Sequence, residues 1–147
     1  MIPPFADNGL LPAGVYTCSL DEVRDRFGSF QVTDRRSKLY AGLELYLQEA
    51  KASGLVTAVI LNGSFVTAEV QPNDIDVIIA MRPGHDMAVD LRPLEYNVVS
   101  RRQIKSRHRL DALVAVDGSE VYDKYVAFFQ AVRGRRDVRK GLLRIEI

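Results

Sequence analysis

The sequence has a single cysteine, Cys18, and only two histidines, His85 and His108, among its 147 residues. One cysteine cannot form a disulfide within the chain, which favours a reducing compartment. Neither histidine has a second histidine or a cysteine pair at zinc-binding spacing, so zinc is not expected. A nucleophilic cysteine–histidine site is not indicated either, because Cys18 lies far from both histidines in the chain.

Long apolar runs and an excess of one charge are also missing. No segment approaches the roughly 18 apolar residues that span a bilayer. The N-terminus, MIPPFADNG, lacks the basic and apolar regions of a signal peptide. These absences predict a cytoplasmic protein that does not associate with membranes. The net charge is +1, so no overall field recruits nucleic acid. The length is that of one domain with one sizeable core.

A polar motif does stand between two apolar runs, in the stretch ILNGSFVTAEVQPNDIDVIIA at residues 60–80. It predicts a strand, a tight turn at Gly63-Ser64, a short helix, a loop and a second strand. Asp74 and Asp76 are two residues apart, so in a strand they project to the same side. Like charges held together favour a divalent cation between them, and oxygen ligands suit Mg²⁺, or Mn²⁺ in its place.

Gly63 and Ser64 supply the other half of the predicted site. A glycine lets the backbone approach a phosphate closely, and free N–H groups where a helix starts favour an anion. Phosphate at the turn and metal at the aspartates together make a nucleoside triphosphate site. Taken singly, Gly-Ser is an ordinary turn and each aspartate an ordinary loop or strand residue. Their combination beside two apolar runs is what favours a functional site.

Gly63-Ser64, followed after nine residues by Asp74-Ile75-Asp76, resembles the signature of the DNA polymerase β-like nucleotidyltransferase superfamily. In size the chain is nearest to the minimal bacterial members, often encoded in toxin–antitoxin or defence pairs. The resemblance implies that Gly63 and Ser64 contact the triphosphate of an NTP and that Asp74 and Asp76 hold metal. The flanks, residues 2–27 and 128–147, resemble a poorly characterised bacterial family that carries this domain.

Superfamily members usually place a third carboxylate on the strand after the paired aspartates. Asp111 opens the predicted strand 110–116 in that way, although a solvated strand-end residue would also fit there. Asp117 is the second candidate for this ligand, but Asp117-Gly118 is more typical of a turn. Asp90 is expected on the surface of a helix.

The remaining patterns predict an α/β (α+β) fold of nucleotidyltransferase type, with helices on a small mixed sheet of about four strands. Residues 1–147 form a single domain in this interpretation, with residues 1–18 as an arm packed on it. Apolar runs predict strands at 55–61, after Asp76, at 110–116 and from 141. Caps and helical spacing predict helices after Ser19, from Thr33 or Asp34 to Gly54, over 86–105 with a break at Pro93, and from Ser119 to Gly134. The aromatic residues of this last helix are expected in the core.

The sequence contains two basic runs. One leads into the third predicted strand, and the other precedes the fourth. Each is either a solvated face or a surface that contacts triphosphate or a nucleic-acid acceptor through phosphates. Neither run contains interleaved aromatic residues, which argues against single-strand stacking. The first comprises Arg101, Arg102, Lys105, Arg107, His108 and Arg109; the second comprises Arg133, Arg135, Arg136, Arg139 and Lys140.

These observations predict a metal-dependent nucleotidyltransferase. It would transfer a nucleoside monophosphate from an NTP to a hydroxyl of a protein, nucleic acid or small molecule, with two Mg²⁺ ions at Asp74, Asp76 and Asp111. Larger superfamily members carry a further helical domain that this chain lacks, so a protein partner or a second copy is expected to complete the site. The alternative is a non-catalytic binding module, such as an antitoxin or regulatory subunit, that keeps the same fold.

Overall fold

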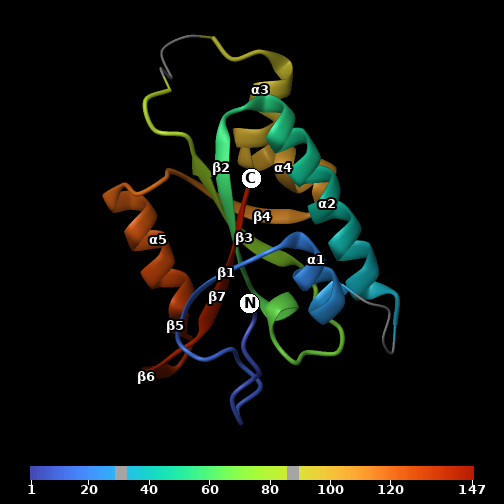
Figure 1. Ribbon diagram of the computed structural model, residues 1–147, viewed down its shortest axis with the longest axis vertical. Helices are drawn as coiled ribbons and strands as arrows, with labels where there is room; N and C mark the ends of the chain where they lie inside the picture. The colour runs from blue at the N-terminus through green and yellow to red at the C-terminus, as the bar shows by residue number, and fades with distance from the viewer. Residues whose placement is uncertain (29–32, 86–89) are drawn as a thin grey trace.

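The computed structural model describes residues 1–28, 33–85 and 90–147. A mixed sheet lies at its centre, with strands in the order β1 (Gly14–Cys18), β7 (Gly141–Glu146), β2 (Val56–Asn62), β3 (Ile75–Met81) and β4 (Leu110–Val116) (Figure 1). β3 and β4 run parallel, as do β1 and β7, whereas β2 is antiparallel to both β3 and β7. The α+β fold with a mixed sheet is therefore as the sequence predicts.

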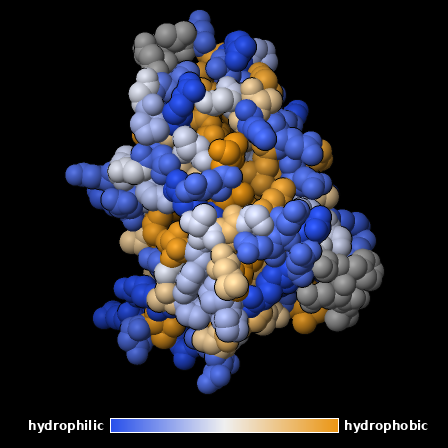
Figure 2. All heavy atoms as spheres, in the orientation of Figure 1, coloured by the Kyte–Doolittle hydropathy of each residue, from blue (hydrophilic) through white to orange (hydrophobic). Residues whose placement is uncertain are grey.

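Helices cover both faces of this sheet (Figure 1). One face carries α1 (Leu20–Val23) with the π-helical turn η1 (Arg24–Gly28), α2 (Arg35–Ser53), α3 (Pro93–Val99) and α4 (Arg101–His108). The other face carries α5 (Glu120–Gln130), which is followed by a hairpin of β5 (Ala131–Val132) and β6 (Arg135–Arg139). Figure 2 shows apolar residues along the middle of this view and hydrophilic residues over most of its margins. Within the described residues, no helix has the length and apolar character needed to cross a membrane.

The sheet separates two apolar clusters because alternate residues of a strand face opposite sides. Val59 and Leu61 of β2 join Leu43 of α2 in one cluster. Ile60, between them, joins Phe129 of α5 in the other. β2 is thus buried on both faces, in agreement with its continuous apolar sequence.

Local signals place several helix ends where the sequence predicts them. The Ser19 hydroxyl accepts a hydrogen bond from the Glu22 N–H at 3.1 Å, and the Glu22 carboxylate accepts one from the Ser19 N–H at 2.9 Å, which forms the predicted capping box. Asp34 immediately precedes α2, and Gly54 ends it in the left-handed conformation with φ 70°. Ser119 caps α5 through the Tyr122 N–H.

The sheet has five strands, one more than the approximate number of four that the sequence predicts. The fifth is β1, which lies inside the predicted arm 1–18 and pairs with β7. The expected end of the last helix at Gly134 is wrong. α5 ends at Gln130, and Gly134, with φ 77°, lies instead between the two strands of the β5–β6 hairpin. Glycine suits either kind of chain reversal, so the residue alone does not decide between them.

The helix predicted over 86–105 is only partly present. Residues 86–89 lie outside the described residues, and Asp90 is exposed but not helical. Pro93 begins α3 as expected, but Ser100 separates α3 from α4 and caps the second helix through the Gln103 N–H. Phe128 of α5 is 70% exposed, which corrects its assignment to the core.

Asp117 forms the predicted turn and also an ion pair that the sequence did not indicate. Its two carboxylate oxygens accept hydrogen bonds from Arg144 of β7 at 2.8 and 3.1 Å, and Thr57 donates a third at 2.9 Å. The side chains of Arg144 and Asp117 are only 18% and 21% exposed. Hydrogen bonding to Arg144 holds the pKa of Asp117 below its ordinary value. Asp117 is therefore a structural residue outside the carboxylate cluster.

We expect Asp117→Asn to destabilise the fold by about 2–3 kcal/mol, because Arg144 would lose the carboxylate that accepts two of its hydrogen bonds and would keep only the exposed Glu146 as an ion-pair partner. Urea unfolding at pH 7 measures this difference. The stabilising contribution is present above the pKa of an unfolded aspartate, about 3.9, and is lost as the pH falls through the lower folded pKa. The difference between wild type and variant should therefore disappear in acid. A difference that stays constant down to pH 3 would contradict the ion pair.

Candidate metal centre

Asp76 and Asp111 are register partners on the parallel strands β3 and β4, and each is the second residue of its strand. Register partners point to the same face of a sheet, so the two carboxylates lie side by side. Asp74 immediately precedes β3. One ligand oxygen from each of the three residues lies within 4.8 Å of the other two. The structure thus brings together all three carboxylates that the sequence singles out, and the group could hold a metal ion.

Arg109 sets the point at which β4 begins. It ends α4 with φ 60° and ψ 32°, and it is the one non-glycine residue with positive φ among the described residues. Its N–H donates to the Lys105 carbonyl at 3.0 Å, which satisfies the end of the helix. This left-handed residue turns the chain directly from α4 into β4, so that Asp111 stands level with Asp76.

Gly63 lies against Asp76. Its φ of 87° and ψ of −175° fall in a region that only glycine adopts readily. A Cβ atom at this position would lie 3.0 Å from Asp76 Oδ2 and 3.2 Å from the Asp76 backbone nitrogen. The glycine is therefore required for close packing of the turn on a carboxylate, and its predicted contact with phosphate stays a prediction.

Ser64 begins η2 (Ser64–Val66), a single turn of 3₁₀ helix in place of the predicted short helix. Its side chain is partly exposed, and its hydroxyl makes no hydrogen bond with another described residue. The hydroxyl is therefore available to a ligand. One turn of helix has a negligible dipole, so the helix-terminus argument for anion binding does not apply here.

Asn62 is a residue that the sequence reasoning missed. It pairs with Asp76 in the β2–β3 register and is only 5% exposed. Its Oδ1 is buried without a hydrogen-bond partner among the described residues. A buried unsatisfied oxygen costs about 1–3 kcal/mol, which suits a position beside a ligand better than an apolar core. The available signal was a polar residue at the end of an apolar strand.

The charges of the three carboxylates are unequally compensated. Burial, hydrogen bonding to Asp111 and the neighbouring charges raise the pKa of Asp74 to about 6. Burial and the charge of Asp111 also raise the pKa of Asp76. In contrast, Lys105 donates to Asp111 Oδ1 at 2.8 Å, and this hydrogen bond lowers the pKa of Asp111. Raised pKa values at two of three convergent carboxylates are typical of a site that a cation completes.

The two basic runs each bring one lysine to this cluster. Lys105 comes from the first run, and Lys140, from the second, is near enough to Asp76 for their charges to interact. Burial lowers the pKa of Lys140, and Asp76 partly offsets this effect. Other members of the runs have different partners: Arg101 donates to the Ala112 carbonyl and Arg107 pairs with Glu49. The runs are therefore not uniform solvated faces.

Arg36 of α2 fixes the loop that follows Ser64, and the sequence reasoning missed it as well. Its side chain is buried, with 3% exposure, and its guanidinium donates to the carbonyls of Phe65, Thr67 and Glu69. A guanidinium presents several donors in a rigid fork, so one side chain can hold three carbonyls. The Gly63-Ser64 turn is consequently anchored to α2 as well as to β2.

In metal-free protein we expect Asp74→Asn to leave the melting temperature unchanged or to raise it, because the substitution removes one of three crowded negative charges. The pH dependence provides the second measurement. Folded Asp74 binds its proton more tightly than unfolded Asp74, so wild-type stability should rise as the pH falls from about 7 towards about 5, and the variant should lack this rise. A drop of several degrees on substitution at pH 7.5 would make Asp74 a structural loop residue instead.

Comparison with known proteins gives a family but no activity. A family model described as "Family of unknown function (DUF6932)" matches residues 3–146. No curated protein matches the chain, and no solved structure does.

Proposed function

We propose that this chain, which belongs to the family of unknown function DUF6932, is a metal-dependent nucleotidyltransferase. It would transfer a nucleoside monophosphate from an NTP to a hydroxyl acceptor. The observation that carries the proposal is the convergence of Asp74, Asp76 and Asp111 within 4.8 Å, next to the Gly63-Ser64 turn. Three carboxylates without histidine or cysteine form an oxygen-only donor set, which suits Mg²⁺ or Mn²⁺.

The residues present fit such an ion. Asp76 is central, because it touches Gly63 and stands between Asn62 and Asp111 in the sheet. The unpartnered Oδ1 of Asn62 adds a fourth oxygen beside Asp76. When bound, the ion neutralises phosphate charge and aligns the acceptor hydroxyl with the α-phosphate.

The chain itself would bind and orient the reactants. The Ser64 hydroxyl would donate to the β- and γ-phosphates, and Lys140 would face the negative charge that builds on the leaving group. The acceptor oxygen would bond to the α-phosphorus and give its hydroxyl proton to a carboxylate of the cluster. The bond from the α-phosphorus to the bridging oxygen would break, and pyrophosphate would leave with that electron pair. Catalysis of this kind is mostly positioning and charge neutralisation.

One contact favours the alternative of a non-catalytic binding module. Lys105 donates to Asp111 Oδ1 at 2.8 Å, and this ammonium occupies one of the oxygens that a metal would use. A lysine that neutralises a carboxylate can replace a cation and leave a scaffold without turnover. Because the Lys105 side chain is about half exposed, at 54%, a divalent ion could still displace it.

Incubation with labelled ATP, CTP, GTP or UTP, Mg²⁺ and cell lysate tests the proposal. We expect one class of macromolecule to become labelled. Ser64→Ala should reduce kcat/KM roughly ten- to a hundredfold, since a hydrogen bond to a charged group is worth about 1.5–3 kcal/mol. The matched control is Ser106→Ala, which removes an exposed hydroxyl of α4 and should leave the rate unchanged. Absence of any labelled product from wild type with all four nucleotides would favour the binding module.

A further inference from the structure

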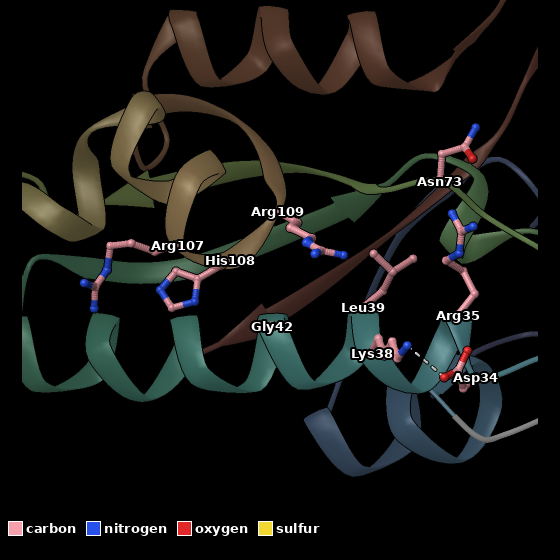
Figure 3. Close-up of a pocket in the computed structure, with 9 residues that line it drawn as sticks. All are labelled: Asp34, Arg35, Lys38, Leu39, Gly42, Asn73, Arg107, His108 and Arg109. Carbon is pink, nitrogen blue, oxygen red and sulfur yellow. Dashed lines mark ion pairs between the residues drawn. The ribbon is translucent and has the colours of Figure 1, made fainter.

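One hollow of the described structure lies beside the carboxylates, and none of the three lines it. It has a volume of about 660 Å³ and lies between α2 and the segment that joins α4 to β4 (Figure 3). Arg35, Lys38 and Leu39 of α2 form one side, and Arg107 and Arg109 lie across from them. Asn73, the residue before Asp74, completes the wall. The pocket therefore reaches the chain segment that carries one of the three carboxylates.

The lining of this pocket is strongly basic. Four side chains carry positive charge, namely those of Arg35, Lys38, Arg107 and Arg109, against the single carboxylate of Asp34. Lys38 pairs with Asp34 at 2.9 Å, and Arg107 pairs with Glu49 at 2.6 Å. Arg35 and Arg109 are both exposed and form no ion pair with any described residue. Unpaired guanidinium groups in a concave site suit phosphate oxygens, which they can bind in pairs.

One further group in the lining lacks a partner. The His108 side chain is only 4% exposed, and its two ring nitrogens form no hydrogen bond of good geometry. Nε2 lies 3.3 Å from Glu49 Oε1, but burial lowers the pKa of the imidazole, so the ring adds no fixed charge. Asp34 compensates the charge of Lys38 and Glu49 compensates that of Arg107, so the net positive charge of the pocket comes from Arg35 and Arg109.

A second basic hollow lies at the other basic run. The hairpin residues Arg135, Arg136 and Arg139 line a space of about 540 Å³, and Lys140, next in the chain, interacts with Asp76. Basic residues therefore approach the carboxylates from two parts of the chain. Arg109 lies two residues before Asp111, between α4 and β4, and Lys140 lies between β6 and β7. A single phosphate could occupy only one hollow, whereas a chain with repeating phosphates could occupy both.

We infer that the pocket between α2 and β4 binds the backbone phosphates of a polynucleotide, which serves as the acceptor. The role of the polynucleotide as acceptor rests on the proposed function, whereas its binding requires neither metal nor turnover. The donor NTP would occupy the Gly63-Ser64 turn beside Asp76, so the pocket beside Asn73 is free for the second substrate. Arg35 and Arg109 would each hold one phosphate.

The test measures binding of a fluorescent ten-nucleotide single-stranded RNA by anisotropy, in EDTA and in an Asp76→Asn background. The test variant adds Arg35→Gln and Arg109→Asn, because asparagine tolerates the left-handed backbone at position 109. Loss of two charge-assisted contacts should weaken binding at least about tenfold, and the slope of log affinity against log salt should fall by about 1.4, at about 0.7 per contact.

Arg82→Gln together with Arg102→Gln is the matched control. It removes the same charge from two exposed arginines outside the pocket, and Arg82 lies past the far end of β3, about 26 Å from Asp74 at strand spacing. This control should change affinity less than twofold. Equal losses in control and test variants, or no RNA binding at all, would overturn the inference. ATP binding is measured separately, in Mg²⁺ and with Asp76 intact. If Arg35→Gln with Arg109→Asn abolishes ATP binding but leaves RNA binding unchanged, the inference is also overturned, because the pocket would then hold the donor.

The two proposals fail separately. Wild type without transferase activity, but with RNA binding that depends on Arg35 and Arg109, would refute the transferase and keep the pocket. Labelled product from wild type, at a rate unaffected by the Arg35→Gln and Arg109→Asn changes and with unaltered RNA binding, would keep the transferase and refute the pocket. Thermal unfolding of each variant checks that the fold is retained in all arms.

Discussion

Asp76→Asn is expected to abolish Mn²⁺ binding and to reduce nucleotidyl transfer to background. Asp76 lies at the centre of the site, since it lies against Gly63 and pairs in register with Asn62 and Asp111. Loss of a metal removes several kcal/mol of transition-state stabilisation, which corresponds to a rate decrease of roughly 10³-fold or more. Titration calorimetry with Mn²⁺ and the labelled-nucleotide assay measure the two effects.

The control for this substitution is Asp90→Asn, which removes the same charge from an exposed aspartate outside the cluster. It should bind Mn²⁺ and transfer nucleotide like wild type. Because asparagine has nearly the same shape as aspartate, a folding defect is not expected from Asp76→Asn. If the Asp76 variant binds Mn²⁺ as tightly as wild type does, the three carboxylates are not the metal site, and the proposed transferase loses its main support.

Gly63→Ala should both destabilise the fold and disturb the site. The backbone conformation at Gly63 is nearly restricted to glycine and costs other residues about 1–3 kcal/mol. In addition, the new Cβ would lie 3.0 Å from Asp76 Oδ2, so the carboxylate would have to move. We expect a melting temperature lower by roughly 5–10 °C and Mn²⁺ binding weaker than that of wild type.

Gly118→Ala separates backbone strain from displacement of Asp76. Gly118 also has a positive φ, of 74°, but no atom lies within 4 Å of the Cβ that alanine would add. This variant should lose some stability, through strain alone, and should keep wild-type Mn²⁺ affinity. Should Gly63→Ala and Gly118→Ala lose the same stability and bind Mn²⁺ equally well, the close packing of the turn on Asp76 would have no functional importance.

Several features of the site followed from the sequence because they depend on local rules. Asp74 and Asp76 are two residues apart, and the alternation of side chains in extended chain predicts that they project to the same side. Asp76 lies in β3 and Asp74 immediately precedes it. The apolar runs predict the strands β2 and β4, of which β2 is continuously apolar and buried, and the Ser19 capping box predicts the start of α1. Asp111 was singled out by resemblance to a superfamily; the structure places it within 4.8 Å of the other two carboxylates, and its role as a metal ligand stays a prediction.

Predictions that needed more than local pattern were less accurate. The arm 1–18 contains β1, which is a strand because β7 offers an unpaired edge for Gly14–Cys18, and no pattern within the arm shows that edge. Gly134 forms a hairpin turn because the chain must return along β6 to β7. Phe128 follows the helical period of its neighbours, but the sheet surface under α5 is already covered by Phe129 and adjoining side chains.

By itself the sequence determined the elements that carry the carboxylates and the chemical type of the candidate metal ligands, since both depend on residue identity and short-range spacing. Only the tertiary structure decided which groups surround those carboxylates. Asn62 lies beside Asp76 through strand register, and Arg36 contacts the loop after Ser64 from α2. Of the eleven residues in the two basic runs, Lys105 and Lys140 are lysines that interact with the carboxylates, which the sequence did not indicate. These contacts join residues far apart in the chain, and their geometry is fixed by packing of the whole sheet and its helices rather than by local propensity.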